Sequence, residues 1–444
     1  MIHTEYHICR VSSSPAARWA TITKFEIPVL LAISPVLLFP TPARLVVLAV
    51  VPVLLFAAYR STGRALPVTP MNVALFVLLG MVAVSLSVTI DVVLSLGKVC
   101  GVLLGTLLFW AIVRWVTTAD RLQFATVVYV LAGVGLAASG LFGANWDNKF
   151  TVVGAITSHI PAAIRGVPGA EVGFNTNAIG GCLILFIPVQ ISLLAMGTRR
   201  AFPDVQRSWS GSGSLLVQLL LLGVTAGTLV LTESRTSWIA LVIGIGFFLI
   251  WFRRSTRIAV AVAAAAVLGW IGVVGFDTAW NAIVSRAGPA FISTFDLRMK
   301  LWLPGMAGIK DRPLTGFGMN VFRKIILTRY PGYPALPTEE PAHVHNHLLQ
   351  AALDLGIPGL VAYLALWIVA ALLLVDVHRR SSVPACRSMA SGLGIGLIAH
   401  FVFGMADVIP LGSKVGVLFW LTLALVVALH HVAVPSPQGS RVTR

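Results

Sequence analysis

The sequence predicts an all-α integral membrane protein with about twelve transmembrane helices. Of its 444 residues, 57% are hydrophobic and only 11% are charged, whereas charged residues make up about a quarter of an ordinary soluble domain. Apolar runs recur along the chain, and crossing a bilayer takes about 20 apolar residues. No internal repeat or low-complexity tract interrupts this pattern. We therefore interpret residues 1–444 as a single polytopic membrane domain.

Each predicted span is an apolar run with few charges. The runs lie at 25–42, 44–59, 70–89, 92–116, 122–143, 176–196, 214–232, 236–252, 257–275, 351–375, 388–411 and 413–433. The first run follows a polar stretch and has no small-residue cleavage site, so we expect a retained helix and not a signal peptide. Four cysteines, two in spans and two in cytoplasmic segments, suggest no disulfide.

The basic residues orient these spans. A net charge of +16 would by itself be compatible with a nucleic-acid partner. With a cytoplasmic N-terminus, however, 18 of the 32 Lys and Arg residues fall in cytoplasmic segments and only six in short outer loops, and long loops count little in this comparison. Both termini are therefore expected in the cytoplasm, where the arginines meet anionic lipid headgroups. Nucleic acid is not an expected partner.

This orientation brings three segments to the outer side: residues 144–175, the turn 231–237 and the long loop 276–347 between the ninth and tenth spans. A structureless loop of that length is unusual in a compact domain and is commonly functional or disordered. Aromatic residues and helical stretches in 276–347 favour order. The large outer loop is therefore expected to carry part of the functional site.

Within this loop, Ser293 or Thr294 is expected to cap an amphipathic helix that carries Leu297 and Leu301. The helix either lies at the membrane surface, with Arg298 presented to a headgroup or pyrophosphate, or packs on the domain with Arg298 solvated. The stretch alone leaves both possibilities open.

The segment "PAHVHNHLLQAALDLGIPG" (341–359) ends the loop. Asn346 is expected to cap a short helix, 347–355, and Gly356 stands where a helix end favours a left-handed residue. Pro358 suits the first turn of the following helix, and Gly359 permits close helix packing. The histidines therefore precede a short helix at the membrane surface.

His343, His345 and His347 alternate, and three roles are possible for them. The first is metal binding: an extended segment would direct all three side chains to one face as ligands, with a carboxylate from Glu339 or Glu340. A helix that starts at Asn346, however, breaks the alternation and turns His347 away. The second role is hydrogen bonding at a helix start, and the third is that of a neutral imidazole acting as a general base near physiological pH. We favour the base and expect no metal.

Several motifs resemble the O-antigen ligase family of bacterial membrane glycosyltransferases. His345-Asn346, nine residues and then Gly356-Ile357-Pro358-Gly359 match the H-[NSQ]-x9-G-x-x-G signature of these ligases. "FNTNAIGGCLILFIPV" (174–189), "LTESRTSW" (231–238), "LRMKLW", "PLTGFGMNVF" (313–322) and "GMADV" (404–408) follow the family's order. The resemblance covers roughly residues 170–410. It implies a fold similar to the glycosyltransferase C class.

The resemblance also implies an activity. These ligases transfer a glycan from undecaprenyl pyrophosphate to a sugar hydroxyl of the lipid A–core oligosaccharide, at the periplasmic face of the Gram-negative inner membrane, with neither metal nor ATP. The family's histidine corresponds to His345, and its two arginines correspond to Arg235 and Arg298, where Arg286 and Lys300 compete for the second position. Guanidinium groups suit pyrophosphate oxygens.

Other side chains near these motifs remain secondary candidates. Arg165 in the 144–175 loop is a third pyrophosphate candidate, with an ordinary surface charge as the alternative. His343 and His347 either orient His345 or contact the acceptor. Asp407, an ionisable residue in a predicted span, is either functional or pairs with an arginine to hold helices together.

Three other functions remain open on the sequence. An O-antigen polymerase or a protein O-oligosaccharyltransferase would use the same family chemistry on a different acceptor. A transporter also suits twelve spans, but it would be expected to carry ionisable residues at mid-membrane and matching broken helices in two halves, which we do not find in the sequence.

Overall fold

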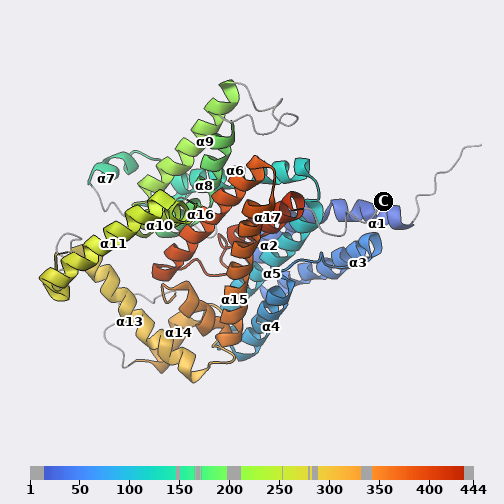
Figure 1. The fold of residues 1–444 in the computed structure, drawn as a ribbon. Coiled ribbons are helices and arrows are strands. Elements are labelled where there is room, and N and C mark those ends of the chain that lie inside the picture. The colour runs from blue at the N-terminus through green and yellow to red at the C-terminus, as the bar shows by residue number, and fades with distance from the viewer. Residues whose placement is uncertain are drawn as a thin grey trace, which may run out of the picture.

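The computed structural model describes residues 15–146, 151–164, 166, 171, 173–197, 212–252, 254–278, 281–282, 289–331 and 343–434. Helices dominate this part of the chain (Figure 1). The first half contains α1 (Pro15–Lys24), α2 (Glu26–Leu38), η1 (Pro42–Ala49), α3 (Val50–Thr62), α4 (Asn72–Val88), α5 (Val92–Trp115), α6 (Ala119–Gly143), α7 (Thr151–Thr157) and α8 (Thr176–Gly197). The second half contains α9 (Ser212–Leu231), α10 (Arg235–Phe252), α11 (Arg254–Val274), α13 (Pro289–Asp311), α14 (Phe322–Arg329), α15 (His347–Arg380), α16 (Pro384–Ala406) and α17 (Val417–Ala433). A two-residue parallel pair joins β1 (Ala144–Asn145) to β2 (Phe174–Asn175).

Each of the twelve predicted spans contains a helix. Seven helical segments of the described chain are long and apolar enough to cross a membrane, and α15 is the longest. The other five, within α2, α4, α9, α10 and α17, are shorter apolar helices of 10–17 described residues each. The all-α, multi-pass prediction is thus confirmed, whereas the number twelve stays a prediction.

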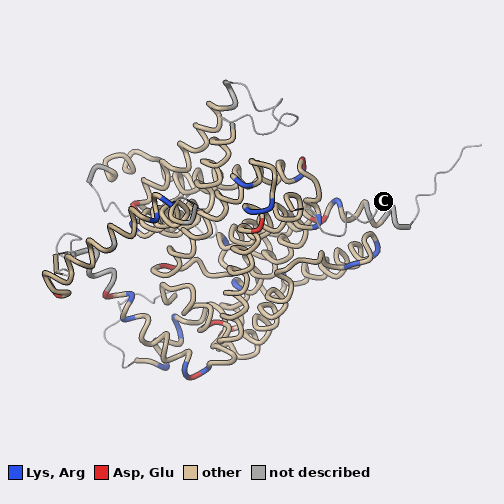
Figure 2. The backbone as a smooth tube through the Cα atoms, in the orientation of Figure 1, with Lys and Arg blue, Asp and Glu red and all other residues tan. Residues whose placement is uncertain are grey.

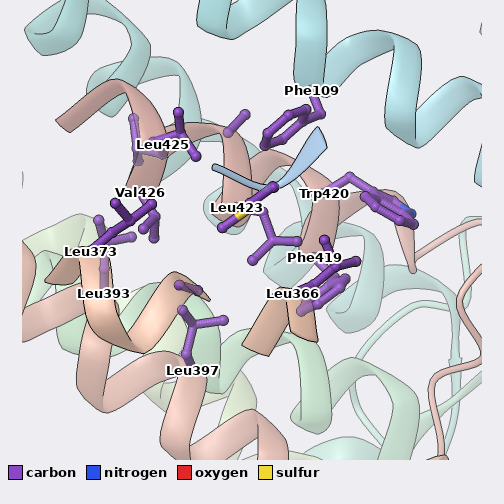
Figure 3. Packing of buried hydrophobic residues seen from close by; sticks show 14 of the residues in the cluster. Phe109, Leu366, Leu373, Leu393, Leu397, Phe419, Trp420, Leu423, Leu425 and Val426 are labelled. Carbon is purple, nitrogen blue, oxygen red and sulfur yellow. The ribbon is translucent and has the colours of Figure 1, made fainter. Parts of the chain in front are cut away.

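Helices distant in sequence form the core. Phe419 and Trp420 of α17 pack with Phe109 of α5 and Leu366 of α15, and all four side chains are buried (Figure 3). Glycines let these helices approach closely: a Cβ at Gly105 would lie 2.1 Å from the Trp420 ring. The interior is mostly uncharged, and Figure 2 shows charged residues near α13, near α14 and at helix ends.

The described part of the long loop 276–347 is mostly helical. α13 and α14 lie together at one side of the bundle, beside α15 (Figure 1). Their shared core contains Leu301 of α13, Phe322 of α14, and Val344 of the histidine segment, all buried. α13 is therefore packed on the domain, which was one of the two predicted possibilities, and not separated from it at the membrane surface. Its predicted start is wrong, because the helix begins at Pro289 and Ser293 and Thr294 lie inside it; Pro is well suited to the first helical position.

Candidate functional site

The short helix after the histidines has the predicted ends. Asn346 is extended and its side-chain oxygen accepts hydrogen bonds from the backbone N–H groups of Leu348 and Leu349, at 3.0 and 3.1 Å. Gly356 interrupts α15 with φ 70° and ψ 177°, a conformation reached essentially only by glycine. A Cβ there would lie 2.4 Å from the Leu314 carbonyl oxygen, and one at Gly359 would lie 2.3 Å from the Leu355 Cβ. α15 is thus a short helix and a long helix joined at a kink.

His345 lies directly before this helix and contacts Asp407. Its backbone φ is +50°, which is uncommon for a residue other than glycine. This conformation brings Nδ1 to 2.9 Å from Asp407 Oδ1. Asp407 follows the last residue of α16, and its Oδ1 also accepts the N–H of Val408 at 2.8 Å. Two segments 62 residues apart in sequence therefore meet as a histidine–carboxylate pair.

The charge state of Asp407 defines the tautomer of this histidine. Burial raises the pKa of the carboxyl, but His343 and His345 outweigh it and hold the pKa well below its usual range. An ionised carboxylate only accepts hydrogen bonds. In neutral His345 the proton therefore lies on Nδ1, which donates to Asp407, and Nε2 carries the free lone pair. This is the arrangement in which an imidazole acts as a general base.

His343 and Arg298 complete the surroundings of the carboxylate. The rings of His343 and His345 lie 4.4 Å apart between centroids, and His343 Nε2 is 3.8 Å from Asp407 Oδ1. Burial lowers the pKa of His343 and outweighs the opposing effect of Asp407, so this imidazole is neutral at pH 7. Arg298 approaches the other carboxylate oxygen at 3.7 Å. The expectation of a solvated Arg298 is therefore wrong, and the expectation that Asp407 pairs with an arginine is correct.

His343, His345 and Asp407 also form a set of possible metal ligands. One ligand atom from each lies within 4.8 Å of the others, and two imidazoles with a carboxylate are a common zinc donor set. The carboxylate comes from Asp407, because Glu339 and Glu340 lie outside the described residues. Within this set, His345 and Asp407 are hydrogen-bonded to each other.

His347 is separated from this group, as the predicted helix start requires. Its ring is buried, and Nδ1 lies 2.9 Å from the hydroxyl of Tyr363. A Cβ at Gly404 would lie 2.7 Å from the ring. The three alternating histidines thus divide into two at Asp407 and one beneath the short helix.

Arg235 is the first residue of α10. α10 and α16 run antiparallel: Gly244 packs closely on Ile395 and Ala399, whereas the start of α10 packs on Gly180 of α8, whose neighbour Gly181 reaches His400 further along α16. Arg235 lies about nine residues before Gly244 on α10, and Asp407 follows Ala399 by about the same number of residues on α16. At a rise of about 1.5 Å per residue, the two residues are therefore at the same height along the bundle. Arg235 therefore lies at the end of the bundle that holds the histidines, and we call this the histidine end. It also stands at a helix N-terminus, which favours anions.

The start of α8 lies at the same end. Its Gly180 packs on the turn before α10, where a Cβ would lie 2.8 Å from Ser237 Oγ and 3.0 Å from Ser234 Cβ. Its Gly181 carbonyl lies 2.8 Å from His400 Nδ1 of α16. The N-termini of α8 and α10 are therefore neighbours beside the end of α16.

Two of the other predicted candidates are not described. Arg165 and Arg286 lie outside the described residues. Lys300, the second competitor of Arg298, pairs with Asp296 at 2.5 Å one helical turn earlier. Of the predicted pyrophosphate ligands, Arg235 and Arg298 are thus the described ones at the histidine end, and their contact with pyrophosphate stays a prediction.

The sequence did not indicate that two further charged residues, Lys98 and Asp354, lie near the histidines. Lys98 lies in the second turn of α5, inside the predicted run 92–116. Its charge interacts with the charges of Asp354 and His343. Asp354 is buried in the short helix. A lysine within an apolar run is a weak signal, and only its intramembrane position would have marked it.

Comparison with known proteins identifies part of the chain. Residues 219–364 match the family model described as O-antigen ligase, and no curated protein matches the chain. The matched segment contains Arg235, Arg298 and His345 and ends before Asp407. It confirms the resemblance inferred from the motifs and supports, at family level, a membrane glycosyltransferase of the ligase or polymerase type.

Proposed function

We propose that this chain, a third of which matches the O-antigen ligase family, transfers a glycan from undecaprenyl pyrophosphate to a sugar hydroxyl of the lipid A–core oligosaccharide. The reaction takes place at the periplasmic face of a Gram-negative inner membrane. The observation that carries the proposal is the pair of His345 and Asp407, which leaves Nε2 of an oriented imidazole as a base.

The chemistry is a direct displacement. Nε2 of His345 takes the proton of the acceptor hydroxyl as its oxygen attacks the anomeric carbon. The bond from this carbon to the pyrophosphate oxygen breaks, undecaprenyl pyrophosphate leaves with the electron pair, and the anomeric centre inverts. Asp407 stabilises the imidazolium that forms. The leaving group is already activated, so neither a metal ion nor ATP is required.

Cationic groups at the histidine end suit the pyrophosphate. Arg235 combines a guanidinium with the N-terminus of α10, and both favour phosphate oxygens. Arg298 adds a second guanidinium whose several N–H donors can serve a phosphate as well as Asp407. Charges already in place before the bond breaks lower the barrier most in a site that excludes water. Arg165 is a third candidate for this role.

An apolar groove suits the lipid chain of the donor. α10, α15 and α16 enclose about 460 Å³, lined by residues that include Phe248, Trp367, Ile368 and Phe401. The rings of Trp367 and Phe401 lie 5.9 and 4.8 Å from the ring of His347, so one end of the groove lies next to His347. In the donor, only the two phosphates lie between the lipid chain and the reacting carbon. In the acceptor, the whole core saccharide lies between the acyl chains and the reacting hydroxyl. The groove therefore matches the donor.

A gene deletion with complementation tests the function. A strain without the gene should show lipid A–core without O-antigen and accumulate unligated polymer, and the wild-type gene should restore the lipopolysaccharide ladder. A core carrying a single repeat would instead indicate a polymerase. An unchanged ladder together with the loss of glycosylated proteins would indicate a protein O-oligosaccharyltransferase.

A further inference from the structure

Gln350 connects the histidine segment to the short helix. Its side-chain oxygen accepts the backbone N–H of Val344 at 3.0 Å, and its side-chain nitrogen donates to Asp354 Oδ1 at 2.8 Å. Val344 stands between His343 and His345. All three residues of this connection are at least 95% buried, so each lost partner would leave a polar group unsatisfied away from water.

Asp354 holds a second loop as well. Besides Gln350, its carboxylate faces the backbone N–H of Asn320 and the charge of Lys98, and its backbone carbonyl accepts the N–H of Gly318 at 3.2 Å. Asn320 has a backbone φ of +66°. Asp354 thus lies between two residues in the left-handed region: it is close to Asn320, and it is connected to His345 through Gln350 and Val344. Such conformations persist only where the surroundings hold them.

We propose that Gln350 and Asp354 are positioning residues that hold the 343–345 backbone so that His345 meets Asp407. Gln350 touches neither His345 nor Asp407, and it acts through the Val344 amide. The hydrogen bond to Asp407 cannot by itself hold both the backbone and the ring direction of His345. The kinetic consequence of this inference rests on the proposed function, because it requires His345 to be the base.

The most direct test of this positioning role exchanges the amide of Gln350 and the carboxylate of Asp354. In Gln350→Glu, two carboxylates face each other across a 2.8 Å contact. In Asp354→Asn, the half-buried Lys98 loses the nearby carboxylate, and a single amide oxygen replaces the two carboxylate oxygens that face Gln350 and Asn320. In the double variant Gln350→Glu/Asp354→Asn, Glu accepts from Val344 and from the new Asn, and one negative charge remains beside Lys98. The double variant therefore restores the hydrogen bonds of the wild type, but in the bond between residues 350 and 354 the donor and the acceptor are exchanged.

We expect each single variant to lower kcat for ligation by about a hundredfold, since small misplacements of a catalytic group have effects of this size. KM for the lipid-linked donor should change less than about twofold, and the double variant should recover to within about threefold of wild type. Rates are measured on purified full-length protein in lipid nanodiscs, per mole of folded protein.

Gln190→Leu is the matched control for Gln350→Leu. Gln190 is also buried, on α8, and accepts the Thr225 hydroxyl at 2.6 Å. That hydroxyl also reaches the backbone carbonyl of Leu222 at 3.0 Å, so the loss of the amide is tolerated. A double variant no faster than the single ones, or equal kcat losses for the two leucine variants, would overturn the inference.

Hydrogen exchange gives a readout that needs no activity. In wild-type protein the Val344 amide should be strongly protected, and Gln350→Leu should accelerate its exchange at least about tenfold, while Gln190→Leu should not. Unchanged exchange in Gln350→Leu would overturn the positioning inference even in a fully active enzyme. Protected Val344 in a protein without ligation would instead overturn the proposed function and leave the positioning intact.

Discussion

The left-handed backbone of His345 is the most informative single feature of the molecule. Only three residues other than glycine have a positive φ in the described part of the chain, and the others are Glu233 and Asn320. Glu233 lies two residues before Arg235, and Asn320 contacts Asp354. Strained backbone concentrates at functional sites because the surroundings hold it there. The positions of these residues thus agree with a site at the histidine end.

Asp407→Asn should lower kcat for ligation by about a hundredfold or more, because an amide no longer secures the proton of His345 on Nδ1. KM for the donor should change little. The matched control is Asp376→Asn, because Asp376 pairs with His430 at the same 2.9 Å in the bundle. Steady-state kinetics that found equal effects at both carboxylates would contradict the role of Asp407.

Chelation tests whether the same residues bind a metal ion. Since His345 acts through its hydrogen bond to Asp407, treatment with EDTA should leave the ligation rate within about twofold of its starting value. Loss of activity with EDTA and recovery with Zn²⁺ would show that His343, His345 and Asp407 bind a required ion.

At the residue scale, the sequence was sufficient for His345 and for the capping role of Asn346. The motif, the helix start and the kink glycine are all local in sequence. Asp407 was only an ionisable residue in an apolar run, since its partner lies 62 residues away and periodicity carries no information about such a pairing. The network of Gln350, Asp354 and Lys98 was missed for the same reason.

Among the elements, α15 depends most on one residue. The kink at Gly356 lets the loop that contains Pro313 pack against α15, because the N–H of Ile357 reaches the Pro313 carbonyl at 2.7 Å. This loop also donates the Phe317 N–H to the Leu353 carbonyl at 2.8 Å. The short helix and the outer loop are therefore one unit, and the kink positions the histidines above the membrane-crossing part of α15.

Gly356→Ala should destabilise the protein by roughly 3 kcal/mol or more, because alanine must adopt a glycine-only conformation and its Cβ meets the Leu314 carbonyl. Gly135→Ala is the control, as a Cβ at this α6 glycine meets nothing within 4 Å. Thermal unfolding in detergent measures both. Equal midpoints for the two variants would show that the kink is not required.

Element boundaries were predictable where capping chemistry was clear and less so elsewhere. Asn346 and Gly356 mark the ends of the short helix as expected. Ser293 and Thr294 are good capping residues that the structure does not use as caps, because the helix already starts at Pro289. A residue suited to N-capping does not mark a helix start when tertiary packing favours a helix that continues through it.

At the scale of the whole molecule, the charge pattern orients the bundle. Helices match all twelve predicted runs, yet five of these helices have at most 17 described residues, so composition alone cannot give the number of crossings. The distribution of basic residues predicts that both termini lie in the cytoplasm and the histidine end outside. Which loops fold against which helices could not be predicted, because nothing local in the sequence encodes the packing of α13 on α15.

Accessibility labelling tests this orientation. Leu314→Cys, in an exposed position of the outer loop, should react with a membrane-impermeant maleimide in cells whose outer membrane alone is permeable. Arg379→Cys, exposed at the end of α15, should react only after the inner membrane is opened. The native cysteines at 100, 182 and 386 are buried and should stay unlabelled. The reverse pattern would contradict the orientation.

The central claim is that His345 is the general base of glycan transfer, and the most direct test is ligation by purified protein with donor and acceptor supplied. His345→Ala should lower the rate by at least about a hundredfold, with normal binding of the donor, while His431→Ala, exposed near the end of α17, should retain the wild-type rate. The product should carry an inverted anomeric linkage. Near-normal ligation by His345→Ala would contradict the account.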